Sequence, residues 1–204
     1  MSKPEQELAD IKAMMERSTR FLSLSGLAGV MAGSYALVAT GLAYYWIYYP
    51  HAPFGPQISY INEQSILIKL LTTAFIILVA AIGTGWVLSQ NKSKRTATKF
   101  WTPASKRFTR ALFIPVATGG LFCLALMSKG YMELVAPATL IFYGLGLFNS
   151  SHFTLSDIKY LGYCQLTLGV IAAFFPEWGL VLWALGFGIL HIVYGTMMHF
   201  KYDR

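Results

Sequence analysis

The sequence predicts an all-α fold: a polytopic membrane protein with six transmembrane helices and a short N-terminal cytoplasmic amphipathic helix. Two observations lead to this prediction. Apolar residues make up 55% of the 204 residues, and Asp, Glu, Lys and Arg together make up 12%, about half the charged share of an ordinary soluble domain. The few charges also leave six long runs without Asp, Glu, Lys or Arg. A soluble globular domain and a disordered chain are therefore excluded.

The six runs are expected to be helices because they are apolar on every face, as in LLTTAFIILVAAIGTGWVL, whereas the strands of a membrane barrel alternate. A cytoplasmic or interfacial helix over residues 1–20 comes first, with Ser2 and Glu5 at capping-box spacing and an apolar stripe for the membrane surface or a partner. A cytoplasmic tail, 201–204, comes last. The approximate spans between them are residues 21–47, 66–89, 110–128, 133–151, 159–176 and 178–200.

The distribution of positive charges predicts the orientation. With the N-terminus inside, 14 of the 16 Lys and Arg residues fall on the cytoplasmic side, and Lys69 and Lys129 fall outside. Both termini are therefore expected in the cytoplasm. The first apolar run is longer than the roughly 7–15 residues of a signal-peptide core, so we expect it to stay as a span.

Two loops are long enough to deserve separate interpretation. The first outer loop, YYPHAPFGPQISYINE, has room for a site, and an enzyme using His51 and Glu63 there is the least favoured function. The second inner loop is basic, which either sets the topology or binds anionic lipid headgroups. Because topology explains its charges, we expect no nucleic-acid partner. The residues expected near headgroups are Lys92, Lys94, Arg95, Lys99, Trp101, Lys106 and Arg107.

Small residues in the first span predict close helix packing. Gly29 and Gly33 form a GxxxG step, and Ala28, Ala32 and Ala36 form a second ridge beside it. A helix of the same chain is the expected neighbour, and a partner chain is the alternative. Residues 119–153 and 169–200 also share a hairpin plan, which hints at a parallel duplication.

Polar residues inside the spans define a candidate ligand site. His191 and Gln165 lie at similar depths, roughly 10–13 Å from the cytoplasmic end, and Asn149, Tyr163 and Tyr194 fall in the same half. The functional interpretation is a proton relay or small-ligand site. The structural interpretation is a neutral His191 that locks span six to span five. No cofactor or metal is expected, since haem would need a second deep histidine and no HExxH motif occurs.

Three stretches resemble a family of small bacterial multi-span membrane proteins of unassigned function. They are MERSTRFLSLSGLAGVMAGSYALV, FYGLGLFNSSHFTLSDIKYLGY and GFGILHIVYGTMMHFKY, at residues 15–38, 142–163 and 186–202. The resemblance covers both ends and the middle of the chain. It implies a bacterial cytoplasmic membrane and brings no catalytic residues.

The function expected from these features is that of a non-enzymatic integral membrane protein, acting as an accessory, regulatory or scaffold subunit. Asp and Glu are absent from all six span centres, and the loops are short. The alternative is a small-solute transporter or ligand binder that uses the polar residues around His191 and Gln165. The expected partners are the lipid bilayer, including anionic lipids, and a membrane protein or a second copy of the chain.

Overall fold

The computed structural model describes residues 20–49 and 64–203, together with Gln6. The predicted helix over residues 1–20, apart from Gln6 and Arg20, and the site at His51 and Glu63 lie outside these residues. The described chain is all-helical, as predicted. Its main helices are α2 (Gly26–Tyr48), α4 (Gln64–Arg95), α5 (Pro103–Ser128), α6 (Val135–Ser150), α7 (Ile158–Phe174), α8 (Gly179–Trp183), the π-helix η4 (Ala184–Leu190) and α9 (His191–Tyr202). Short 3₁₀ turns precede or follow three of them: η1 (Met132–Leu134), η2 (Ser151–Phe153) and η3 (Pro176–Trp178).

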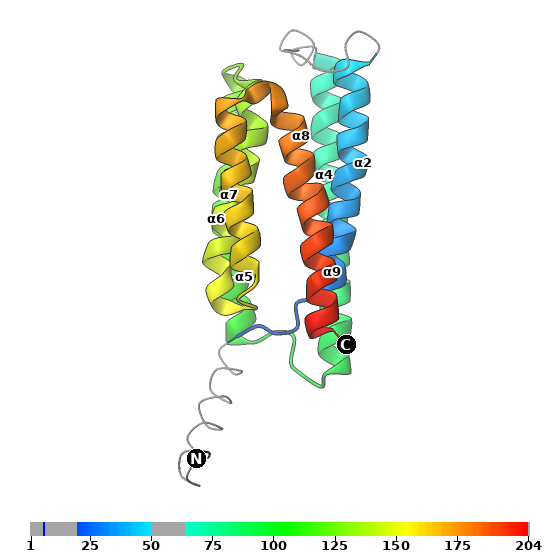
Figure 1. Cartoon of the computed structure of the whole chain (residues 1–204), viewed down its shortest axis with the longest axis vertical. Coiled ribbons are helices and arrows are strands. Elements are labelled where there is room, and N and C mark those ends of the chain that lie inside the picture. Colours follow the sequence, from blue (N-terminus) through cyan, green and yellow to red (C-terminus); the bar gives the residue numbers. More distant parts are fainter. Residues whose placement is uncertain (1–5, 7–19, 50–63, 204) are drawn as a thin grey trace.

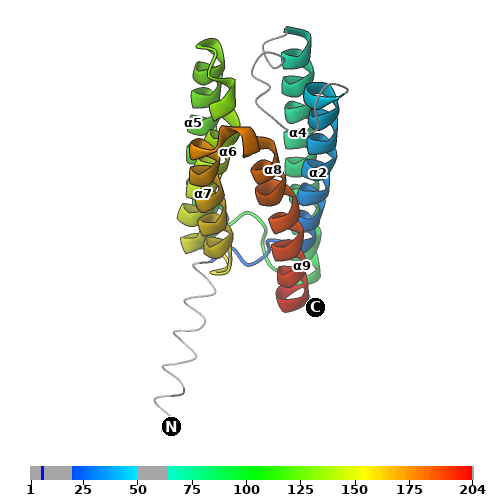
Figure 2. The ribbon, with the colours of Figure 1, turned by 45° about the horizontal axis from the view of Figure 1, so that its top comes forward.

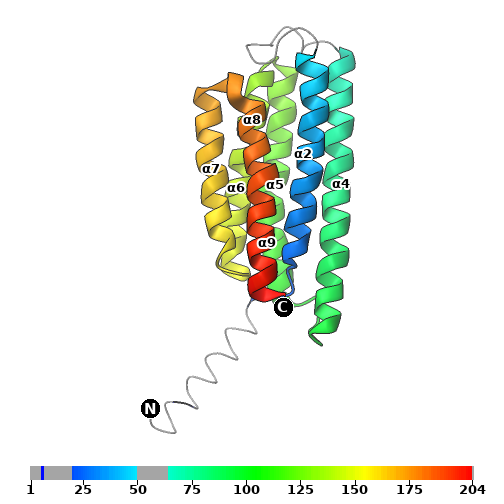
Figure 3. The ribbon, with the colours of Figure 1, turned by 45° about the vertical axis from the view of Figure 1, so that its right-hand side comes forward.

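The helices form two neighbouring groups (Figure 1). In one group α6 packs against α5 and α7, and in the other α2 packs against α4 and against the continuous helix formed by α8, η4 and α9. The chain runs up and down the bundle, so the start of α2 and the end of α9 lie at the same end (Figures 1 and 2). Figure 3 shows α7 at one edge of the bundle and α4 at the other.

Five helical stretches of the described chain are long and apolar enough to cross a membrane: Gly26–Tyr48, Gln64–Arg95, Pro103–Ser128, Met132–Phe153 and Pro176–Tyr202. A sixth apolar helix, Ile158–Phe174, is shorter. Its 17 residues sit at the lower limit of the length that a transmembrane helix needs. The bundle is therefore consistent with a multi-pass membrane protein.

Two helices extend beyond their predicted spans for local reasons. Helix α5 begins at Pro103 rather than near residue 110 because Thr102 and Ser105 form a capping box, in which each side-chain oxygen accepts a hydrogen bond from the other residue's backbone N–H. Helix α4 continues past residue 89 to Arg95. The three basic residues in its last turn, Lys92, Lys94 and Arg95, suit the negative end of the helix dipole.

The helix of the first span begins later than predicted, at Gly26, and residues 21–25 before it have no regular secondary structure, with Ser25 extended. This segment joins the two groups of helices across one end of the bundle (Figure 1). Phe21 N donates to Phe153 O at 2.7 Å, and Thr154 Oγ1 donates to Phe21 O at 2.6 Å. At the other end of the segment, Ser25 N donates to Ser89 Oγ of α4 at 3.3 Å.

Candidate functional site

A seam of glycines joins α2 to the last helix of the same chain. A Cβ atom added to Gly33 would lie 2.6 Å from Gly188 O, and one added to Gly195 would lie 2.5 Å from Val30 N. Gly29 also lies in the seam, where an added Cβ would be 3.1 Å from Gly195 Cα. These contacts are with backbone atoms, so a side chain could not be accommodated without separating the helices. Gly29 and Gly33, named from the sequence, thus lie against η4 and α9. Of the alanines named with them, Ala36 is buried and Ala28 and Ala32 are half-buried.

Behind this seam, Gln165 of α7 and His191 of α9 meet at the carbonyl group of Gly186. Gln165 Nε2 donates to Gly186 O at 2.8 Å, and His191 Nδ1 lies 2.9 Å from the same oxygen. A carbonyl oxygen can only accept, so Nδ1 carries a proton and donates. The two side-chain nitrogens are 3.5 Å apart as two donors that share one acceptor. The cluster therefore connects α7 to η4 and α9.

Tyr143 of α6 completes the cluster. Its hydroxyl lies 2.9 Å from His191 Nε2, and its ring stacks with that of His191 at a centroid distance of 5.4 Å. In a neutral imidazole with the proton on Nδ1, Nε2 accepts from the tyrosine hydroxyl. Both ring nitrogens then have a hydrogen-bond partner while the imidazole stays neutral. Three helices are held by one neutral polar group, which agrees with the structural interpretation of His191.

Gly186 is the residue on which this arrangement depends. It lies within the π-helix η4, a rare geometry in which the helical hydrogen bonds are rearranged. A Cβ added to Gly186 would lie 2.6 Å from Gln165 Oε1 and 2.6 Å from Leu140 Cδ2. Gln165 is fully buried, and its Oε1 atom makes no hydrogen bond within the described part of the chain. The cluster thus retains one acceptor without a partner.

The other three residues named for this site lie elsewhere. Asn149 Nδ2 donates to Ala111 O of α5 at 3.1 Å. Tyr163 is exposed and packs its ring against Phe148. Tyr194 packs against an apolar cluster that includes Leu147, Leu161 and Met198. Depth along the spans identified His191 and Gln165, but it did not give the direction in which each side chain points, and so Tyr143 was missed.

A second polar group lies where α2 begins. Asp203 accepts from Gly26 N at 2.9 Å and from Ser25 Oγ at 3.2 Å, and its Oδ1 lies 2.6 Å from Lys92 Nζ. Its carboxylate therefore lies at the positive end of the α2 dipole, where an anion is favourable. Burial alone would raise the pKa of Asp203, but hydrogen bonds from Lys92, His199 and the Gly26 backbone outweigh it and lower that pKa.

This ion pair removes one residue from the expected headgroup set. Lys92 Nζ donates to Leu24 O at 2.9 Å in addition to its pair with Asp203, and the side chain is largely buried. The other members of the set are exposed at the same end of the bundle: Lys94, Arg95, Lys99, Trp101, Lys106 and Arg107. Lys92 therefore fastens α4 to the C-terminus and is not available to lipid.

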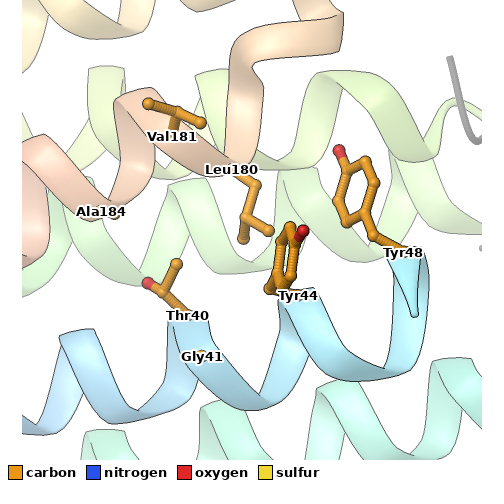
Figure 4. A pocket seen from close by; sticks show the side chains of 7 residues that line it. All are labelled: Thr40, Gly41, Tyr44, Tyr48, Leu180, Val181 and Ala184. Carbon is orange, nitrogen blue, oxygen red and sulfur yellow. The ribbon is translucent and has the colours of Figure 1, made fainter. Parts of the chain in front are cut away.

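A cavity of about 290 Å³ opens between α2 and α8, toward the end opposite Asp203 (Figure 4). Tyr44 and Tyr48 of α2 line the cavity with Leu180 and Val181 of α8, and Gly41 and Ala184 complete its wall. Thr40 also lies in its wall, and its Oγ1 donates to Ala36 O of its own helix. The cavity is mainly apolar and does not include His191 or Gln165.

Among the described residues there is no group of three or more His, Cys, Asp or Glu side chains that could hold a metal ion. Cys123 and Cys164 are free thiols on separate helices. Comparison of the chain with family models, curated proteins and solved structures finds no match.

Proposed function

We propose that the chain is a six-span protein of the bacterial cytoplasmic membrane with both termini in the cytoplasm, and that it acts as a non-enzymatic accessory, regulatory or scaffold subunit. The family resemblance supports the bacterial location. The charge distribution supports the orientation, because the basic ends of α4 and α9 lie at the same end of the bundle. Lys92 pairs with Asp203 there, and Lys201 pairs with Asp157, which precedes α7. The sixth crossing is assigned to Ile158–Phe174.

The observation that carries the proposed role is the pairing of both ring nitrogens of His191 within the polar cluster. Both nitrogens of this histidine have partners, and the residue is only 6% exposed. The side chain best suited to chemistry in the spans is thus used to hold α6, α7 and α9 together. In contrast, α4 lies at the edge of the bundle with many exposed apolar residues, among them Phe75, Ile76 and Ile82. Such a surface suits a protein that works through lateral contacts in the membrane.

The test is the composition of the particle extracted from the native membrane with a mild detergent. We expect a second polypeptide at fixed stoichiometry, or a second copy of the chain, so that the protein mass exceeds 22.7 kDa. A photoreactive residue at Ile76 of α4 should cross-link to that component, and one at Leu121 on the exposed face of α5 serves as the matched control. A particle that contains one copy of this chain and no other protein would contradict the proposal.

A second candidate function, a small-solute transporter or ligand binder, is favoured by one observation. Gln165 Oε1 is buried beside His191 and lacks a partner, so a ligand or water with a donor group would satisfy it. A ligand there requires space that Gly186 and Leu140 now occupy, so the helices would have to separate. If Gln165→Leu abolishes solute binding by the purified chain while the extracted particle stays unchanged, this second function replaces the first.

A further inference from the structure

An open hollow of about 300 Å³ lies at the basic end of the bundle, on the first turns of α5. Trp101, Lys106, Thr109 and Arg110 line it. The last three residues share one helix face, because positions three and four apart lie above one another in an α-helix. Two positive charges and a hydroxyl therefore face the same space.

None of these polar side chains is committed elsewhere in the part of the chain that the structure describes. Lys106 and Arg110 form no ion pair there, unlike Lys92 and Lys201. Thr109 does not return its hydroxyl to its own helix, as Thr40 and Thr84 do. The backbone N–H of Ser105 and that of Thr102 are satisfied by the capping box, so the side chains supply the free donors. A group with several acceptor oxygens and negative charge fits this set.

The wall formed by Trp101 is fixed by other aromatic rings. The Trp101 ring lies 5.8 Å from that of Trp86 and 6.1 Å from that of Phe100, measured between centroids. Phe100 in turn contacts Phe21, at 5.7 Å. Clusters of tryptophan are typical of the headgroup region of a bilayer. The hollow is therefore at the depth where phospholipid phosphates lie.

The same face of α5 becomes apolar immediately beyond the hollow. Phe113 and Ile114 follow Arg110 by three and four residues, and both are exposed. Leu121, two turns further along, is 70% exposed. A hollow that carries two cationic side chains and a hydroxyl thus continues into an apolar track along the helix. That combination matches a lipid with an anionic head and hydrocarbon tails, and a free phosphate ion would not use the track.

We infer that the hollow lined by Trp101, Lys106, Thr109 and Arg110 binds the phosphate-bearing headgroup of an anionic phospholipid, whose acyl chains lie along Phe113 and Leu121. The site rests on the proposed membrane placement but not on the proposed role as a subunit. The lipid site can be present in a protein that has no partner subunit, and a partner subunit can be present without the lipid site.

The test measures how many lipid molecules remain on the full chain in native mass spectrometry. The purified, delipidated protein is offered equal amounts of phosphatidylglycerol and phosphatidylcholine with identical acyl chains. We expect a clear preference for phosphatidylglycerol that falls by fivefold or more in the Lys106→Gln, Arg110→Gln variant, since one cation near a membrane surface contributes about fivefold. The matched control is Lys94→Gln, Arg95→Gln, which removes the same charge outside the hollow and should lower the preference less than the Lys106→Gln, Arg110→Gln variant does.

Equal losses in the two variants, or no preference in the unmodified protein, would overturn the site, because the attraction would then be diffuse. Competition with inorganic phosphate distinguishes a lipid headgroup from a free phosphate ion as the ligand. Inorganic phosphate should displace no more phosphatidylglycerol than chloride at the same ionic strength, and displacement by phosphate would contradict the lipid assignment. Thermal unfolding of both variants in lipid-free detergent checks that each is folded. Extraction of the native protein from its membranes by alkaline carbonate would instead contradict the membrane placement on which the site rests.

Discussion

Helices α2 and α4 lie side by side, and both carry glycines in an apolar sequence, yet Gly33 of α2 and the two glycines of α4 have opposite surroundings. An added Cβ at Gly33 of α2 would overlap backbone atoms, whereas one at Gly83 or Gly85 of α4 would meet nothing within 4 Å. Residues four apart share a helix face, and residues two apart do not. The spacing of glycines, more than their number, therefore marks the helix that approaches another backbone.

The largest effect should come from a branched side chain in the glycine seam. We predict that Gly33→Leu lowers the free energy of unfolding by about 3 kcal/mol, because Gly188 O and Ile192 N are backbone atoms that cannot move aside. The measurements are folded yield and thermal unfolding in detergent. Gly83→Leu on α4 is the control and should leave both unchanged. Equal behaviour of the two variants would remove the distinction between α2 and α4.

The polar contact that joins α2, α4 and α9 should have the next largest effect. Asp203→Asn removes the carboxylate at the start of α2 and leaves Lys92 without its partner, which should cost about 2 kcal/mol.

The pH dependence of this effect has a definite sign. The folded-state pKa of Asp203 is lowered, so its contribution is present above the unfolded pKa of about 3.9 and is lost as the pH falls through the folded value. The difference in melting temperature between the native chain and Asp203→Asn should therefore shrink below about pH 4. A difference that stays constant down to acid pH would show that the carboxylate charge is irrelevant.

The polar cluster of His191, Gln165 and Tyr143 should contribute less to the free energy of unfolding. His191→Phe keeps a ring between Tyr143 and Phe187 but removes two hydrogen bonds, and bonds of this kind inside membranes average about 0.6 kcal/mol each. We expect a loss of about 1 kcal/mol in unfolding free energy. A double-mutant cycle with Tyr143→Phe should give a positive coupling energy. Strict additivity would mean that the two side chains do not interact.

The smallest effect is expected at the exposed end of α9. Lys201 Nζ lies 2.7 Å from Asp157 Oδ2, and this hydrogen bond is the main cause of the lowered pKa of Asp157. Exposed ion pairs contribute little because water screens them. We predict no measurable change in melting temperature for Lys201→Gln. A clear loss would show that this pair ties the two groups of helices more strongly than the buried contacts suggest.

The apolar helices could be predicted from the sequence because lipid leaves a spanning segment few alternatives to a helix. Their ends were harder to predict, since charged residues can extend a helix beyond the apolar run, as Lys92 and Arg95 do in α4. The start of α5 did have a signal, because Thr102, Pro103 and Ser105 have the pattern of a capping box.

The sequence predicted the depth of His191 and Gln165 along their helices, but it did not predict the direction in which each side chain of the site points. The tight turn between α7 and the last helix sets His191 and Gln165 at the same level, and they meet. The π-helix rotates the residues around Gly186 relative to a regular α-helix, which sequence periodicity does not reveal. Tyr143 comes from α6, a helix whose rotation depends on contacts such as Gly144 with Leu166.

The central claim is that the glycine face of α2 is covered by the last helix of the same chain, which leaves α4 at the edge. A disulfide between Leu37→Cys and Gly188→Cys tests it directly in a background of Cys123→Ala and Cys164→Ala. The Leu37 side chain now occupies the space of a Gly188 Cβ, so shortening it makes room for the new cysteine. Mild oxidation should give a cross-linked monomer, and the control pair Gly83→Cys with Gly188→Cys should give none. A cross-linked dimer, or a folded protein that forms no disulfide, would contradict the account.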